Sequence, residues 1–155
     1  ISIQTWIYPI AFGAFKAVFD SPNRHLAFFI NSPTTGYYGM GGGDGALNFS
    51  RPILLNKWQL LTFVKESTTA RVYINGIEID SVAANSTFTD AIYIGKNISS
   101  GGSAFIGLQD DIAIWNTALT ASEVAVIYSR QSAKYSGTYS SSIVNLGASN
   151  SWTNI

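Results

Sequence analysis

The chain has 155 residues, a formal net charge of +0, no cysteine and only 12% charged residues. This length suits one domain with a sizeable core, and the balanced charge excludes the basic field that nucleic acids or anionic membrane surfaces attract. Without cysteine there is no disulfide framework and no thiolate metal site, and a single histidine excludes a His-rich zinc centre. The low charge and the many Ser, Thr, Asn and Gly residues are typical of a β-rich extracellular domain.

No stretch of the sequence is long and apolar enough to predict a membrane span. The longest apolar runs, such as residues 28–30 and 53–55, are far shorter than the roughly 20 residues that a spanning helix needs. The chain starts at Ile1 inside an alternating pattern, without a charged signal-peptide start. We therefore interpret it as a segment of a longer protein.

Alternating apolar residues predict many short strands. Ile1, Ile3 and Ile7 alternate with polar or aromatic residues and predict a first strand that ends at Pro9. Further strands are predicted at residues 15–19, 26–30, 37–40, 46–49, 58–64, 70–74, 77–80, 91–95 and 104–116. The glycine run at 41–45 predicts a turn or bulge, because it lacks the Gly-Lys-Ser/Thr ending of a phosphate loop and no helix pattern follows it.

Two local signals are stronger than the rest. Asn75-Gly76 between alternating runs predicts a type I′ hairpin, because both residues tolerate a positive φ. Thr120 and Glu123 form a capping box that predicts one short helix at 120–128. After residue 130 the composition becomes Ser-rich, so we expect a domain at 1–130 and an extended tail at 131–155. That tail is either the start of a further module or a strap onto this domain or a neighbouring subunit. Together the elements predict an all-β, two-sheet antiparallel sandwich of the jelly-roll type.

Four segments, in order along the chain, carry a family resemblance. They are residues 3–9, 57–63, 70–76 and 106–120, the last of which has a glycine, a short spacer, an acidic pair, a strand and a capped helix. This pattern resembles the laminin-G-like branch of the concanavalin A-like lectin and glucanase superfamily. The resemblance implies a sandwich of two curved antiparallel sheets. It also implies relatives that bind glycans or proteins, sometimes with calcium, and a minority that hydrolyse polysaccharides.

The carboxylates argue against an enzyme. Glycoside hydrolysis needs two carboxyl groups facing each other across the bond, but the only glutamates, Glu66, Glu78 and Glu123, belong to separate elements. The run Glu-x-Asp-x-x-Glu of the hydrolases that this superfamily resembles is absent. Asp110 and Asp111 are adjacent, so on a regular strand they point to opposite faces and cannot act as a pair. With His25 as the only imidazole base, we predict a non-catalytic domain.

The candidate ligand-binding residues are aromatic and polar groups on loops, because aromatic rings stack on sugars while amides and planar charged groups bind their hydroxyls. In the loops these candidates are Asp20, Asn23, Arg24, His25, Asn31, Tyr37, Tyr38 and Asp44. Trp6 and Tyr8 are further candidates, because they face away from the Ile3 side of their strand and could lie on an open sheet face. The alternative, which applies above all to Trp6, is that they pack in the framework of the domain. Trp58 is expected in the core. Replacing Tyr37 and Tyr38 together by alanine is expected to abolish glycan binding while the fold stays intact.

The acidic pair and the tail suggest the setting of the domain. Asp110 or Asp111 resembles the acidic position that holds a structural calcium ion in some relatives, although no dense acidic loop supplies further ligands. The tail with Trp152 resembles extensions in bacterial surface and fibre adhesins, which are often trimeric. We therefore predict a carbohydrate-binding module of a secreted or cell-surface adhesin, as a possible homotrimer, that binds neither nucleic acid nor a membrane. The alternative is a structural or protein-binding module without a sugar site.

Overall fold

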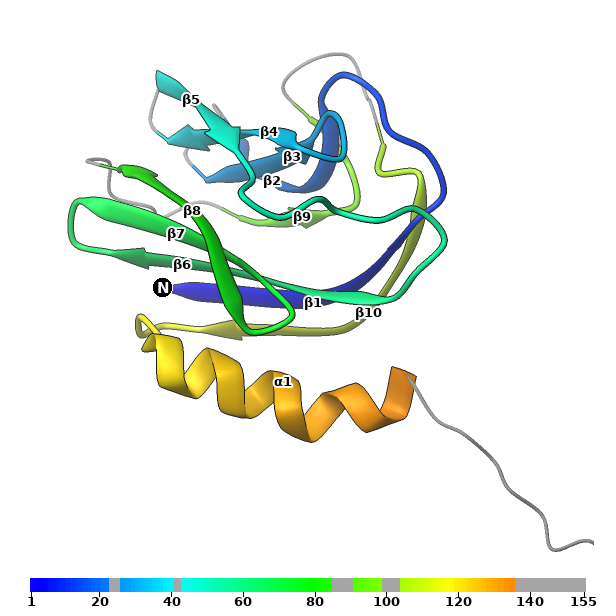
Figure 1. Cartoon of the computed structure of the whole chain (residues 1–155). Helices are drawn as coiled ribbons and strands as arrows, with labels where there is room; N and C mark the ends of the chain where they lie inside the picture. The colour runs from blue at the N-terminus through cyan, green and yellow to red at the C-terminus, as the bar shows by residue number, and fades with distance from the viewer. Residues whose placement is uncertain (23–25, 41–42, 85–90, 99–103, 136–155) are drawn as a thin grey trace, which may run out of the picture.

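The computed structural model describes residues 1–22, 26–40, 43–84, 91–98 and 104–135. These residues form two antiparallel five-stranded sheets stacked as a sandwich, with one helix beneath (Figure 1). Sheet A has the strand order β10-β1-β6-β7-β8 and sheet B the order β5-β4-β3-β2-β9. The predicted two-sheet sandwich is therefore confirmed.

The elements have the following bounds: β1 Ser2–Pro9, β2 Lys16–Asp20, β3 Ala27–Ile30, β4 Thr35–Met40, β5 Gly43–Asn48, β6 Gln59–Glu66, β7 Thr69–Ile74, β8 Ile77–Ala83, β9 Tyr93–Ile94, β10 Gly107–Trp115 and α1 Ala121–Tyr135. All ladders between neighbouring strands are antiparallel. Gly41 and Gly42 of the predicted glycine turn lie outside the described residues, and the rest of that run belongs to β5.

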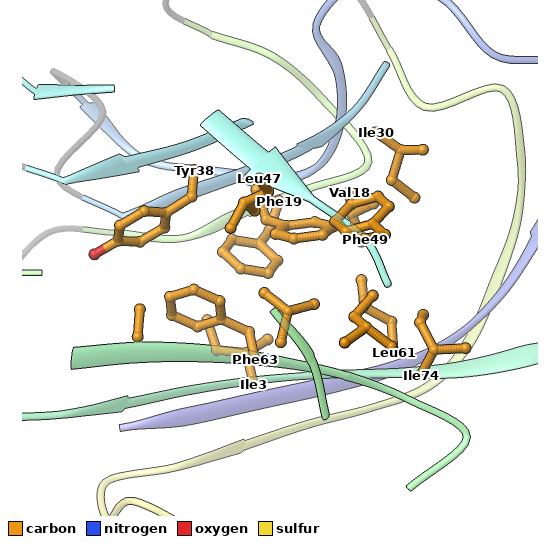
Figure 2. Packing of buried hydrophobic residues seen from close by; sticks show 14 of the residues in the cluster. Ile3, Val18, Phe19, Ile30, Tyr38, Leu47, Phe49, Leu61, Phe63 and Ile74 are labelled. Atoms are coloured by element: carbon orange, nitrogen blue, oxygen red, sulfur yellow. The ribbon is translucent and has the colours of Figure 1, made fainter. Parts of the chain in front are cut away.

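The main core lies between the two sheets. Alternate residues of sheet A, such as Ile3 and Phe63, meet Phe19, Phe28 and Tyr38 of sheet B, as Figure 2 shows for Ile3, Phe19, Tyr38 and Phe63. Each of these side chains is at most 2% exposed. The rings pack closely, with the Phe19 and Phe63 centroids 5.6 Å apart and those of Tyr38 and Phe63 5.3 Å apart. Because successive side chains of a strand point to opposite faces, the remaining side chains of each strand point to the outer face of its sheet.

Helix α1 covers the outer face of sheet A, which makes a second apolar layer. Val124 of the helix is fully buried against Val64 and Tyr73. Both faces of β1 are therefore buried, with Ile3 and Ile7 toward the sandwich core and Trp6 toward the helix.

Both strong local signals are confirmed. Asn75 and Gly76 adopt φ values of +52° and +79°, as a type I′ hairpin requires. At the helix start, the Glu123 carboxylate accepts a hydrogen bond from the Thr120 backbone N–H at 2.7 Å, and the Thr120 hydroxyl accepts one from the Glu123 N–H at 3.2 Å.

The predicted end of the helix is wrong. The helix continues to Tyr135, so the first five residues of the expected extended tail at 131–155 are helical. Tertiary contacts explain the extra turns, because Gln131 bonds the Gln4 and Trp6 side chains and Lys134 pairs with the acidic residues of β10. Within the part of the chain that the structure describes, no helix is both long and apolar enough to cross a membrane.

Candidate functional site

Three aromatic residues on the outer face of sheet B form the candidate site, which we call the aromatic platform: Phe15, Phe29 and Tyr37. Phe29 of β3 and Tyr37 of β4 are directly opposite each other in the ladder, and Phe15 immediately precedes β2. The Phe15 ring lies 5.5 Å from the Tyr37 ring and makes an edge contact with Phe29 at 5.9 Å. Phe29 is fully buried, whereas Phe15 and Tyr37 are half-buried. The platform therefore presents two partly exposed rings on an aromatic base.

The backbone of Phe15 is held in an unusual conformation. Its φ is +55°, in the left-handed region that a bulky residue rarely adopts and that costs of order 1–3 kcal/mol. The side-chain oxygen of Asn31 accepts a hydrogen bond from the Phe15 N–H at 2.9 Å. The side-chain NH₂ of Asn97, a fully buried residue, donates to the Phe15 carbonyl at 3.3 Å. Two amides from distant elements thus fix the position from which the Phe15 ring projects.

The surroundings of Tyr37 are small and polar. Ala46, its partner in β5, is exposed and small, so the register places no bulky side chain beside the ring on that strand. Toward the β3–β4 turn, the hydroxyls of Ser32 and Thr35 lie 2.7 Å apart, and the Ser32 hydroxyl also accepts the Thr35 N–H. An apolar ring surface next to amides and hydroxyls is an arrangement that stacks on one face of a sugar and hydrogen-bonds its edge.

The structure brings together two of the predicted ligand-binding residues, Asn31 and Tyr37, and separates Tyr38 from them. Tyr38 is 2% exposed and belongs to the core between the sheets, because adjacent residues of a strand point to opposite faces. The expectation that both tyrosines serve one surface is therefore wrong. Replacing Tyr38 would damage the core, so the double alanine variant does not leave the fold intact.

The other predicted loop residues are placed as follows. Asp20 is fully buried, and its carboxylate accepts hydrogen bonds from the backbone N–H groups of Ser21 at 2.9 Å and Ile98 at 2.8 Å. It joins two loops rather than facing solvent, which contradicts its expected role in ligand binding. Asn23, Arg24 and His25 lie outside the described residues, and of Asp44 only the backbone is described, paired with Gly39.

Trp6 and Tyr8 lie on the outer face of sheet A, away from the platform. Trp6 is 2% exposed under helix α1, with its indole N–H donating to the Gln131 side chain at 3.1 Å, so the framework interpretation of this residue is correct. Tyr8 is half-buried beside Trp58, with ring centroids 5.5 Å apart. Trp58 is also half-buried rather than in the core as expected. This pair therefore forms a separate aromatic surface on the opposite side of the sandwich.

The acidic pair of β10 does not have the geometry expected from a regular strand. A bulge interrupts the β1–β10 register, and Asp111 has a φ of +47°. Both carboxylates consequently reach the same partner: Lys134 Nζ lies 3.3 Å from Asp110 and 2.8 Å from Asp111. The prediction that the two side chains point to opposite faces is wrong. In the described ranges there is also no group of three or more His, Asp or Glu side chains able to hold a metal ion.

Sequence reasoning missed Phe15 and Phe29, two of the three residues of the platform, and Asn97, whose side chain holds the Phe15 backbone. Phe15 lies at the start of a predicted strand, and nothing in its neighbours signals a positive φ. Its two amide partners are 16 and 82 residues away along the chain. Asn97 follows Gly95 and Lys96, and its amide chemistry is the signal that could have indicated a hydrogen-bonding role.

Solved structures with this fold include binding domains. One is a protein from Bacteroides ovatus named for an inferred carbohydrate-binding role, with 14% identity, a TM-score of 0.65, and coverage of 80% of this chain and 39% of that one. Another is a heptameric SAP-like pentraxin from Limulus polyphemus, with 16% identity and a TM-score of 0.65. The match covers 82% of this chain and 68% of the pentraxin chain. A third is domain 4 of AbnA, a GH43 extracellular arabinanase of Geobacillus stearothermophilus, solved with arabinotriose. Its identity is 21% and its TM-score 0.65, and the match covers 82% of this chain and 65% of the AbnA domain.

These identities establish the fold alone, and the chain spans only about two fifths of the Bacteroides ovatus protein. No curated protein sequence matches the chain. A laminin G-type family model, described as the concanavalin A-like lectin/glucanases superfamily, matches residues 1–125. The strand order, the capped helix and this match agree, and the chain belongs to the concanavalin A-like lectin/glucanase superfamily.

Proposed function

We propose that the domain binds carbohydrate non-catalytically, with the aromatic platform as its sugar-binding surface. The observation that carries this proposal is the backbone of Phe15, which two amides hold at a strained φ so that its ring meets the Tyr37 ring at the surface. Strain of this kind persists only where the surrounding structure enforces it, and it clusters at ligand-binding positions. A rigid ring pair also loses little conformational entropy when a ligand binds.

The described carboxylates support a binding role rather than hydrolysis. Each has a structural partner: Asp20 and Asp80 accept backbone N–H groups, Glu66 and Glu78 pair with Arg71, Asp110 and Asp111 pair with Lys134, and Glu123 caps the helix. A glycosidase instead needs two carboxyl groups free to face the same glycosidic bond. The family itself contains binding modules, and AbnA shows that such a domain also occurs within an enzyme.

The ligand we propose is a neutral glycan on a cell surface, and the setting a secreted or cell-surface adhesin. The net charge of +0 gives no long-range attraction for charged partners, whereas rings, amides and hydroxyls suit uncharged sugars. A homotrimeric arrangement belongs to the same proposal, and sedimentation of the full chain as a stable monomer would contradict that part of it.

A glycan array probed with the full chain tests the proposal, followed by titration of the best neutral oligosaccharide. Tyr37→Ala should weaken binding at least tenfold, because it removes one of the two partly exposed rings, and each tenfold corresponds to about 1.4 kcal/mol. Tyr8→Ala is the matched control, since it removes a half-buried tyrosine from the opposite surface. An array without any hit would favour the alternative of a structural or protein-binding module, and equal affinities for Tyr37→Ala and the parent would reject the platform.

A further inference from the structure

A small cavity lies where the loop between β5 and β6 meets the turn between β7 and β8. This loop leads the chain from sheet B to sheet A (Figure 1). The cavity has a volume of about 190 Å³ and is lined by Arg51, Pro52, Leu54, Gln59, Ile74 and Asn75. None of these residues belongs to the aromatic platform or to the Tyr8–Trp58 pair, so the cavity is a separate feature of the surface.

Hydrogen bonds and one buried side chain fix the loop, although most of its residues are exposed. Ile53 is 1% exposed and packs in the main core, and its N–H donates to the Pro33 carbonyl at 2.8 Å. The next residue, Leu54, donates its N–H to the Gln59 side-chain oxygen at 3.0 Å. A cavity between elements that are already fixed loses little conformational entropy when a ligand binds.

The polar side chains that line the cavity have N–H donors to spare. Gln59 uses both ends of its amide on Leu54, because its NH₂ also donates to the Leu54 carbonyl at 2.8 Å. Asn75 uses its side-chain oxygen to accept the Leu60 N–H at 2.8 Å, whereas its NH₂ has no partner among the described residues. Within the same described ranges, the Arg51 guanidinium forms neither a hydrogen bond nor an ion pair. No carboxylate lines the cavity, so the groups left for a ligand are donors.

A donor-only lining matches a ligand group that only accepts hydrogen bonds. An ionised carboxylate is such a group, and a guanidinium binds it through two parallel N–H donors. The single cation, Arg51, suits one negative charge better than the two of a phosphate. The other walls of the cavity are the apolar side chains of Pro52, Leu54 and Ile74, which suit a short aliphatic group attached to the carboxylate. This attraction acts at contact distance, so it does not need a net charge on the domain.

We propose that this cavity binds a carboxylate carried on a short aliphatic group. Arg51 and the NH₂ of Asn75 hold the carboxylate, while Pro52, Leu54 and Ile74 contact the aliphatic part. The same chemistry occurs in a free aliphatic acid and at the carboxyl end of a peptide chain. The inference goes beyond the proposed sugar binding and does not depend on it, because the cavity and the platform share no residue.

Titration of the isotope-enriched full chain at neutral pH and low salt, followed by amide chemical shifts, tests the proposal. The probes are isovalerate, as a free acid, and N-acetylvaline, as the end of a peptide chain. The better probe should shift the Arg51, Leu54 and Asn75 amides with a dissociation constant in the low millimolar range, as is reasonable for so small a ligand. Tighter binding of N-acetylvaline assigns the cavity to peptide ends, and tighter binding of isovalerate assigns it to free acids. Isovaleramide, the neutral isostere of isovalerate, should bind at least tenfold more weakly than the better probe. Saturable shifts by neither acid, or equal affinities for isovalerate and isovaleramide, would overturn the proposal.

Two matched variants separate the cavity from a general effect of charge. Arg51→Gln removes the guanidinium from an exposed position and should weaken binding of the better probe at least tenfold, since hydrogen bonds to charged groups are the strong ones. Lys57→Gln makes the same change of charge at an exposed position of the same loop that does not line the cavity, and its affinity should equal that of the parent. Unchanged affinity in Arg51→Gln, or an equal loss in both variants, would overturn the proposal.

Discussion

Tyr38 provides the sharpest test of the core, because it buries a hydroxyl that has no hydrogen-bond partner among the described residues. The side chain is 2% exposed, and Figure 2 shows its oxygen pointing away from the neighbouring rings. Burial raises the pKa of the Tyr38 phenol, as expected where the anion would lose its hydration. An unpaired buried polar group costs about 1–3 kcal/mol. Tyr38→Phe should therefore stabilise the domain by about 1 kcal/mol, or raise its Tm by about 2–4 °C for a protein of this size.

The matched control is Tyr73→Phe, because Tyr73 is equally buried but has the polar Glu78 as its partner in the β7–β8 ladder. Burial and then the neighbouring Glu78 raise the pKa of Tyr73 to about 12. Removing this hydroxyl should cost about 0.5–1.5 kcal/mol. Urea unfolding followed by circular dichroism measures both variants. A Tyr38→Phe variant that is destabilised as much as Tyr73→Phe would refute the reasoning, since it would mean that the Tyr38 hydroxyl is satisfied.

The remaining predictions concern the helix and the acidic pair. Gly76→Ala should destabilise the domain by about 1–3 kcal/mol in urea unfolding, because the φ of residue 76 is +79° and an added Cβ would lie only 3.1 Å from Ala125 Cα of helix α1. An unchanged urea midpoint would contradict this contact between hairpin and helix. Thr120→Ala should cost about 1 kcal/mol by removing the cap. The Thr120 N–H and hydroxyl also lower the pKa of Glu123. The cap therefore contributes its full stability above the ordinary carboxyl pKa, and this stability is lost as the pH falls through the lowered pKa. Equal midpoints of acid unfolding for the parent and Thr120→Ala would argue against this contribution. EDTA should leave the Tm unchanged, because Lys134 engages both Asp110 and Asp111, and a clear drop would show that a metal competes for them.

Local signals predicted the elements that depend on local physics. The Asn75-Gly76 turn and the Thr120 cap need only residues close in sequence, and both are present as expected. The opposite orientations of Tyr37 and Tyr38 also follow from the strand period, so the sequence pattern alone argues against placing both side chains in one site.

The features that sequence reasoning missed depend on distant residues. Phe15 adopts its positive φ through amides 16 and 82 residues away, and no local pattern encodes such contacts. The bulge at Asp111 and the extension of the helix to Tyr135 depend on each other through Lys134, which a propensity argument does not contain. The framework was therefore predictable, whereas the geometry of the site required the tertiary structure.

The most direct test of the central claim is a map of amide chemical shifts during titration with the oligosaccharide that the full chain binds best. We expect the largest changes on Phe15, Asn31 and Tyr37, and none at Tyr8 or Trp58. Changes centred on the Tyr8 and Trp58 surface, with the platform unaffected, would contradict it.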